Sequence, residues 1–222
     1  MTRIVLVHGA WHGPWCWEKV LAELRDRQID AVAVELPFTG FADDVESARS
    51  AIAGKGERVV VVAHSYGGAV VSQAISGLTN VVHLVFLAAF VNPGEASALI
   101  DRPLPLLEAI VRDGDRCSFD PKFAKTIFYA DSAPDVVATI VPRLRPMVLD
   151  VTAMLATPSI PSAVPSTYVV CTRDGAIPPA AQLQMAKRVD RVIEWSTDHS
   201  PFLTRPGDLA DLLVERMPAG PA

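Results

Sequence analysis

The feature that most constrains the fold is a junction at residues 58–75, where an apolar run passes directly into a segment of small residues. Residues 58–63 read Arg-Val-Val-Val-Val-Ala, which is typical of a strand buried on both faces of a parallel sheet. His-Ser-Tyr-Gly-Gly follows at residues 64–68, and residues 69–75 continue as an apolar helical stretch. A strand that passes at once into a helix predicts an α/β fold with Ser65 on a sharp turn.

Other short apolar, β-branched runs recur along the chain with helix-like segments between them. This alternation predicts a mostly parallel, doubly wound sheet of about six strands, because each crossover returns the chain to the same edge of the sheet. A closing helix is expected at residues 207–216. The remaining expected strands are residues 4–7, 31–34, 81–90, 167–171 and 192–195.

A long connection separates the strand that ends near Phe90 from the next strand. It spans residues 92–166, roughly 75 residues, which is far more than an ordinary crossover needs. Its prolines stand at the starts of four expected short helices, at residues 104–111, 121–129, 134–140 and 143–155. We therefore predict a single structural domain in which residues 92–166 form a helical cap on a core of residues 1–91 and 167–222.

Composition argues against several classes of function. The chain has 222 residues, half of them apolar, and its net charge is −5 with the basic residues scattered singly. Such a chain has no basic stripe for nucleic acid or an anionic membrane surface. Residues 4–7 are too short for a signal peptide, and no apolar run reaches the length of a membrane span. The three cysteines are irregularly spaced, which disfavours disulfides and zinc, so we expect a cytoplasmic protein.

Residues 63–67, Ala-His-Ser-Tyr-Gly, match the nucleophile elbow G-x-S-x-G with alanine at the first glycine position. Small residues are needed at positions 63 and 67 because the turn brings strand and helix backbones together. A helix that starts just after Ser65 directs free N–H groups at the reacting centre, so Tyr66 N–H is one expected oxyanion donor. The loop after residues 4–7 should supply the other, which we assign to Ala10 N–H.

The acid and the base should follow Ser65 in that order, each after a strand. Asp174 follows the expected strand 167–171, and His199 follows the expected strand 192–195. We predict that His199 accepts the Ser65 proton and that Asp174 orients its imidazole. Glu95 and Asp198 are the alternative acids, although Asp198 would have to reach the ring of its own neighbour.

The other four histidines are weaker candidates for the base. His8 and His64 are expected to have loop roles. His83 lies within a strand, where a hydrogen-bonded core histidine is the simpler interpretation. His12 belongs to the loop expected to form the oxyanion wall. Among the tryptophans, we expect only Trp11 to contact substrate, since packing in the core explains Trp15 and Trp17 equally well.

With these motifs in place, the chain resembles the small α/β hydrolases that include plant methyl salicylate and methyl jasmonate esterases, hydroxynitrile lyases and bacterial carboxylesterases of the pyrethroid-hydrolase type. The similar segments are residues 5–17, 64–68, 170–174 and 198–202. The resemblance implies the α/β-hydrolase fold, esters as substrates beneath a helical cap, and no metal or cofactor. The lyases carry threonine and lysine where this chain has Gly9 and Ser200, so the resemblance favours hydrolysis.

The sequence thus predicts a carboxylesterase of the serine-hydrolase type that forms an acyl-enzyme on Ser65 from small to medium apolar esters. Two alternatives stay open. One is hydroxynitrile lyase or another C–C bond-cleaving activity on the same triad, and the other is a ligand-binding protein with low turnover. We expect neither nucleic acid nor membrane as a partner, and the pattern does not determine an oligomeric state.

Overall fold

The chain is built around one twisted parallel sheet. The structure is a computed structural model that describes residues 2–54, 56–92, 94, 105–148 and 164–218. Within these residues a six-stranded sheet has the order β2-β1-β3-β4-β8-β9, with every neighbouring pair parallel. Its strands are β1 (Thr2–Val7), β2 (Ala31–Val34), β3 (Arg58–His64), β4 (Val81–Leu87), β8 (Ser166–Cys171) and β9 (Arg191–Trp195).

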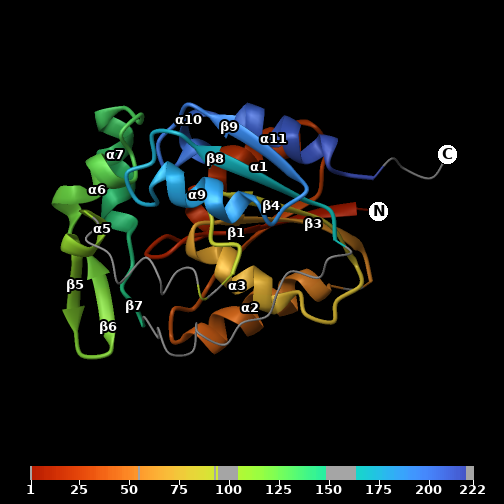
Figure 1. The fold of residues 1–222 in the computed structure, drawn as a ribbon, viewed down its shortest axis with the longest axis horizontal. Helices are drawn as coiled ribbons and strands as arrows, with labels where there is room; N and C mark the ends of the chain where they lie inside the picture. Colours follow the sequence, from red (N-terminus) through yellow and green to blue (C-terminus); the bar gives the residue numbers. More distant parts are fainter. Residues whose placement is uncertain (1, 55, 93, 95–104, 149–163, 219–222) are drawn as a thin grey trace.

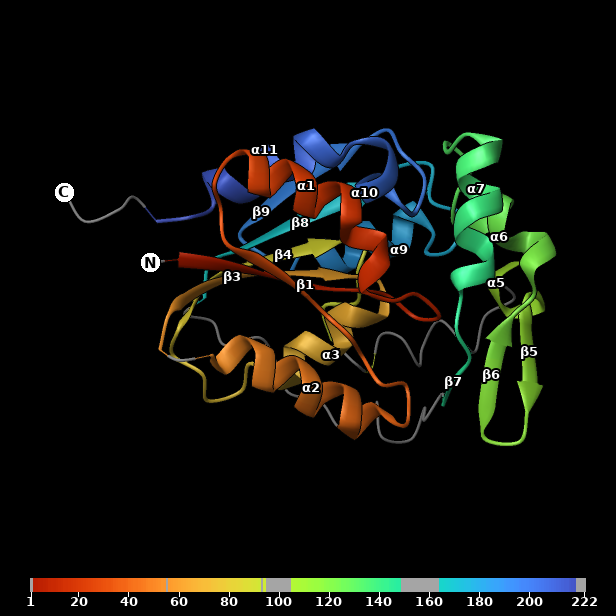
Figure 2. The same ribbon diagram turned by 180° about the vertical axis from the view of Figure 1, so that it is seen from behind.

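Helices cover both faces of this sheet, which confirms the predicted doubly wound α/β architecture. One face carries α1 (Glu18–Asp26) and α11 (Pro206–Glu215), and the other carries α2 (Phe41–Ala53) and α3 (Tyr66–Ala74), as Figures 1 and 2 show from opposite sides. The central strands β1 and β3 are buried along most of their length, with Val5 opposite Val61. Continuous valine runs suit these strands because both of their faces meet a helical layer.

Three short elements complete the core and were not predicted. A 3-10 turn, η1 (Pro14–Trp17), leads into α1, while α9 (Pro179–Ala186) and α10 (Pro201–Thr204) follow β8 and β9. β4 ends at Leu87 rather than at residue 90, because Ala88 takes a left-handed conformation with a φ of 43° and turns the chain. No helix in the described parts of the chain is long and apolar enough to cross a bilayer.

The described helices and strands of the connection between β4 and β8 lie beyond one end of the sheet (Figures 1 and 2). We keep the word cap for residues 92–166, of which 92, 94, 105–148 and 164–166 are described. The cap holds helices and a three-stranded antiparallel sheet of order β5-β6-β7. Its elements are α5 (Pro105–Glu108), β5 (Ile110–Asp113), β6 (Arg116–Phe119), η2 (Pro121–Phe123), α6 (Ala124–Ile127), α7 (Pro134–Ile140), η3 (Val141–Arg143) and β7 (Met147–Val148).

Two of the four helices expected in the cap match the structure, and two were wrong. Residues 121–129 begin as η2 and α6, and α7 spans residues 134–140 as predicted. Residues 104–111 hold only the single turn α5 before β5 starts, because Gly114, with a φ of 62°, closes a tight hairpin between β5 and β6. Residues 143–155 do not start a helix, since Pro146 disfavours helical geometry at the preceding residue; residues 149–155 lie outside the described residues.

Candidate active site

Ser65 sits on the sharp turn between β3 and α3. Its backbone has a φ of 52° and a ψ of −123°, a left-handed conformation that non-glycine residues rarely adopt. Hydrogen bonds hold this turn from both sides: Ser65 N–H donates to Leu87 O at 3.3 Å, and Phe90 N–H donates to Ser65 O at 3.2 Å. Such strain persists only where the surroundings enforce it, and it lifts the Ser65 side chain above the ends of the strands.

Small residues make this turn possible. A Cβ atom at Gly67 would lie 2.6 Å from His8 O and 2.9 Å from Val7 O, so the start of α3 rests on the end of β1. At Gly68 a Cβ would collide with Phe90 O. The close backbone approach predicted at position 67 is therefore present in the structure. Gly68 adds a second close approach that was not predicted from the sequence.

The structure brings Asp174 and His199 together. Asp174 follows β8, His199 follows β9, and His199 Nδ1 lies 2.7 Å from Asp174 Oδ2 with both side chains buried. Asp174 Oδ1 also accepts hydrogen bonds from the N–H groups of Ala176 and Ile177, at 2.7 and 2.8 Å. Because the carboxylate only accepts, His199 Nδ1 carries the proton, which leaves its Nε2 lone pair available as a base.

Gln182 on α9 fixes the acid and was missed by the sequence analysis. Its Nε2 donates to Asp174 Oδ2 at 2.8 Å and to Ile177 O at 2.8 Å, while its Oε1 accepts from Cys171 N–H at 2.9 Å. The side chain thus ties the acid to the end of β8. A glutamine in this short helix was the available signal, but α9 also contains Gln184, and sequence alone does not say which of the two faces inward.

The alternative acid Asp198 points away from the His199 ring. Asp198 Oδ1 accepts a hydrogen bond from Ser200 N–H at 2.9 Å, and Oδ2 accepts one from Asp131 N–H at 2.8 Å. Burial raises the pKa of Asp198. Both oxygens of Asp198 are thus bound by backbone N–H groups of loops, whereas Asp174 is hydrogen-bonded to the imidazole of His199. Glu95, the other alternative, lies outside the described residues.

The other histidines are engaged elsewhere. His8 Nδ1 donates to Gly9 O and its Nε2 accepts from Leu36 N–H, and burial lowers the pKa of His8 to about 3. Burial also lowers the pKa of His83 to about 4, and this ring contacts Thr167 Oγ1 at 2.9 Å within the sheet. Both histidines are therefore neutral and structural at neutral pH.

His64 and His12 lie closer to Ser65 but are also neutral. His64 Nε2 donates to His199 O at 2.9 Å, which fixes the backbone of residue 199 beside the nucleophile turn, and burial lowers the pKa of His64 well below its ordinary value. His12 is buried, its two ring nitrogens are both hydrogen-bonded, and burial lowers its pKa to about 4.

The loop after β1 packs against the nucleophile turn. A Cβ atom at Gly9 would lie 2.9 Å from both Ser65 Cβ and His64 Nδ1, so only glycine allows this approach. Ala10 is the next residue of that loop. On the other side, Tyr66 is the first residue of α3, and its hydroxyl donates to Asp44 Oδ2 at 2.6 Å. The two expected oxyanion donors thus belong to segments that flank Ser65.

Ser65 is partly exposed, unlike its neighbours in the turn. Its hydroxyl makes no hydrogen bond within the described residues. A hydrogen bond between a nucleophilic hydroxyl and its base is commonly long or absent without substrate and tightens only when substrate binds. A hydrogen bond between Ser65 and His199 stays a prediction.

Trp11, the expected substrate contact, is buried against the cap. Its ring lies 5.5 Å from the Phe119 ring and 6.2 Å from the Phe128 ring, measured between centroids. Trp17 is fully buried in the core, as its packing interpretation predicted. A contact between Trp11 and substrate stays a prediction.

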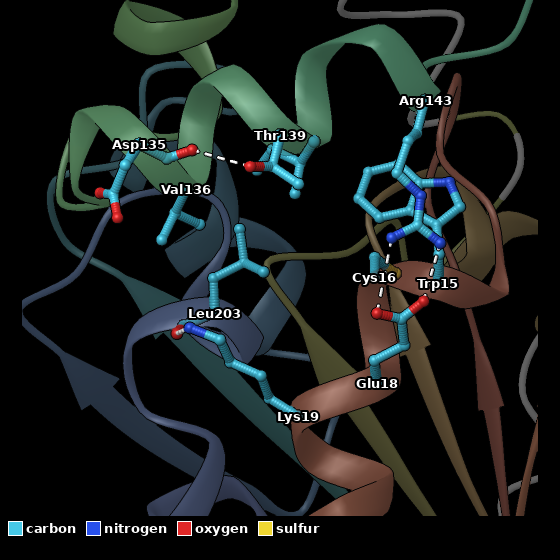
Figure 3. A pocket seen from close by; sticks show the side chains of 10 residues that line it. Trp15, Cys16, Glu18, Lys19, Asp135, Val136, Thr139, Arg143 and Leu203 are labelled. Atoms are coloured by element: carbon cyan, nitrogen blue, oxygen red, sulfur yellow. Dashed lines mark hydrogen bonds and ion pairs between the residues drawn. The ribbon is translucent and has the colours of Figure 1, made fainter.

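A cavity of about 270 Å³ lies between the cap and the core (Figure 3). In its wall, Arg143 pairs with Glu18 at 2.7 Å and lies over the Trp15 ring, while Lys19 donates to Leu203 O at 3.0 Å. None of the predicted catalytic residues lines this cavity.

The cysteines are all buried free thiols, at positions 16, 117 and 171. In the parts of the chain that are described, no three histidine, cysteine or carboxylate side chains are grouped so as to share a metal ion.

Comparisons with known proteins identify the family of this chain. The sequence profile of the alpha/beta hydrolase family matches residues 4–212. The chain is 30% identical to alpha/beta hydrolase nvfD of Aspergillus novofumigatus, over 95% of this chain and 93% of that protein, and 27% identical to methylesterase 7 of Arabidopsis thaliana, over 96% and 95%. The crystal structure of polyneuridine aldehyde esterase superposes with a TM-score of 0.84 at 18% identity and covers 97% of this chain and 99% of its own. The chain therefore belongs to the alpha/beta hydrolase family and has the α/β-hydrolase fold.

Proposed function

We propose that the protein is a carboxylic-ester hydrolase of the serine-hydrolase type, with Ser65 as nucleophile, His199 as base and Asp174 as the orienting acid. The observation that carries the proposal is the buried His199 Nδ1–Asp174 Oδ2 hydrogen bond of 2.7 Å, together with a serine held at a φ of 52° directly after His64, whose Nε2 donates to His199 O. A carboxylate on one side of an imidazole and a strained, partly exposed serine near it are the parts that acyl transfer needs. Esterases among the relatives support the same reaction class.

In this proposal His199 Nε2 takes the Ser65 hydroxyl proton as Oγ attacks the ester carbonyl. The tetrahedral oxyanion is stabilised by the N–H groups of Ala10 and Tyr66, and it collapses as His199 returns the proton to the departing alcohol. Water then attacks the acyl-enzyme in the same way, with His199 again as base, and releases the carboxylic acid. Asp174 keeps the correct tautomer and stabilises the transient imidazolium in both halves.

The substrates we propose are small to medium apolar esters. Aromatic rings lie beside His199. The ring centroid of Phe128, in the cap, lies 5.7 Å from that of His199, and Trp11, in the loop after β1, packs against Phe128. Apolar walls of this kind select acyl or alcohol groups by size and shape. Related proteins carry the names methylesterase and polyneuridine aldehyde esterase, which supports ester substrates as a class.

Position 200 favours hydrolysis over cyanide release. Ser200 directly follows the proposed base. It is fully buried, and its N–H donates to Asp198 Oδ1. A serine brings no positive charge there to stabilise a departing anion, and Gly9 brings no hydroxyl. We therefore place ester cleavage ahead of the lyase reaction.

The test is the Ser65→Ala variant with p-nitrophenyl acetate as substrate. Loss of the nucleophile is expected to lower kcat by about 10⁶-fold, and a fluorophosphonate probe should label the wild-type protein but not the variant. Arg143→Gln is the matched control, because Arg143 is an exposed cap residue away from the triad. Activity of Ser65→Ala within tenfold of the wild type would refute the proposed mechanism.

A further inference from the structure

One short stretch of the cap contacts the three loops that carry Ala10, Asp174 and His199. We call residues 126–131 the cap brace; they comprise the end of α6 and the turn after it. Lys125 Nζ holds this turn by donating to Tyr129 O, Ala130 O and Ser132 O, at 3.1, 2.9 and 2.6 Å. Three carbonyls bound by one ammonium group give the brace a defined shape despite its lack of regular structure.

The brace first meets the loop of the acid. A Cβ atom at Gly175 would lie 2.7 Å from Thr126 O and 3.0 Å from Ile127 O. The residue after Asp174 is therefore in direct backbone contact with the cap. A side chain at position 175 would push the two apart.

Tyr129 connects the brace to the loop expected to form the oxyanion wall. Its hydroxyl lies 2.8 Å from His12 Nε2, and His12 Nδ1 lies 2.8 Å from Ala10 O. A carbonyl only accepts, so His12 carries its proton on Nδ1 and Nε2 accepts from the Tyr129 hydroxyl. Both side chains are almost completely buried. A continuous chain of hydrogen bonds thus runs from the cap to Ala10.

Asp131 connects the brace to both triad loops at once. Its Oδ2 accepts from Asp198 N–H at 2.8 Å and from Arg173 Nη2 at 2.7 Å, while its own N–H donates to Asp198 Oδ2. Arg173 directly precedes the acid, and Asp198 directly precedes the base. One carboxylate of the cap therefore joins the two loops whose relative position sets the Asp174–His199 hydrogen bond.

We infer that Tyr129 and Asp131 are positioning residues: docking of the cap brace aligns the Ala10 amide and the Asp174–His199 pair for reaction. The inference rests on the proposed hydrolase mechanism. It gives the cap a part in the chemical step, in addition to shaping a substrate pocket. Positioning matters because a displacement of about 1 Å in a catalytic group can cost about 100-fold in rate.

The test compares Tyr129→Phe and Asp131→Asn with Arg143→Gln. Both brace variants are nearly isosteric, and the control breaks a different ion pair between cap and core, that of Arg143 with Glu18. With p-nitrophenyl acetate, an ester too small to need the cap walls, each brace variant should lower kcat by about 10–100-fold while KM changes less than about threefold. Arg143→Gln should stay within about twofold of the wild type in both constants.

A transition-state analogue separates positioning from simple loosening of the cap. A trifluoromethyl ketone forms an oxyanion adduct with the serine, so its affinity for Tyr129→Phe should fall by the same factor as kcat/KM, and affinity for acetate should not change. Rates are expressed per site titrated with fluorophosphonate, which removes unfolded protein from the comparison. If Asp131→Asn does not fold, Arg173→Gln replaces it in the comparison. This variant removes the exposed Arg173 side chain as a hydrogen-bond donor to Asp131.

The outcomes are distinct. If the brace variants match Arg143→Gln, or if only KM changes, the inference is overturned while labelling of Ser65 still supports the hydrolase. If the wild-type protein is not labelled and Ser65→Ala is as active as the wild type, the proposed function itself fails.

Discussion

At the scale of single residues, the two candidate acids Asp174 and Asp198 differ in their hydrogen-bond partners. Asp174 faces His199 Nδ1, whereas Asp198 receives backbone N–H groups from residues 131 and 200. The sequence favoured Asp174 because a residue has difficulty reaching its neighbour's ring, and in the structure Asp174 is hydrogen-bonded to the His199 ring. The residues that hold Asp174 were not predictable, because Gln182 approaches it from another helix.

Asp174→Asn should inactivate the enzyme with little loss of fold. Every partner of this carboxylate is a donor, so an amide must place its NH₂ group against another donor or force His199 into the tautomer with the proton on Nε2. A base that already carries its proton cannot take that of Ser65, and kcat should fall by about 10⁴-fold.

The measurement is steady-state hydrolysis of p-nitrophenyl acetate, beside a thermal melt for each variant. Asp208→Asn, at an exposed carboxylate paired with Arg205, is the control and should keep wild-type rates. Only a small loss in Asp174→Asn, within tenfold, would show that another group orients the base.

At the scale of elements, the junction of β3 and α3 depends on backbone contact. The close approach at Gly68 to Phe90 O joins the start of α3 to the segment that follows β4. This contact and the strained Ser65 turn lie next to each other, so the position of the helix and the direction of the serine are coupled.

Gly68→Ala should lower the free energy of unfolding by about 1–3 kcal/mol, because the new methyl group has no space beside Phe90 O. Urea unfolding followed by circular dichroism measures this difference. Gly207→Ala is the matched control: a Cβ there meets nothing closer than Glu23 Oε2 at 3.8 Å, at the start of α11. Equal stabilities of the two variants would contradict the packing argument.

The cap shows where local patterns were insufficient. The β5–β6 hairpin carries a usable signal, Gly114-Asp115 between its strands, but the surrounding apolar residues also fit a helix. β7 could not be found from its own two residues, because Met147 becomes a strand only by pairing with Cys117 on β6. Short strands that depend on a distant partner have little local sequence signal.

At the scale of the whole molecule, burial keeps four histidines neutral. Burial lowers the pKa of His8 to about 3 and that of His12 to about 4, and it lowers the pKa values of His64 and His83 as well. In the unfolded chain these groups titrate near 6.5, so below that pH the unfolded state binds more protons than the folded state. The linkage relation then makes the folded state less stable as pH falls from 7 toward 4.

The free energy of unfolding should therefore be lower at pH 5 than at pH 7, by about 1–2 kcal/mol for each fully buried histidine. Asp44 and Asp198 oppose part of this loss, since burial raises their pKa values. Urea unfolding at both pH values measures the slope, and His83→Gln should reduce it by removing one such group. An unchanged stability between pH 7 and 5 would contradict the burial argument.

The sequence by itself determined the sheet, the position of Ser65 on its turn, and the positions of Asp174 and His199 after β8 and β9, because these depend on local signals: apolar runs, small residues and a polar residue after each strand. Only the tertiary structure decided what holds them. Gln182, the Tyr129–His12 hydrogen bond and the Asp131 bridge join segments far apart along the chain. Such contacts form when the chain folds, so no local pattern encodes which buried polar group will meet which partner.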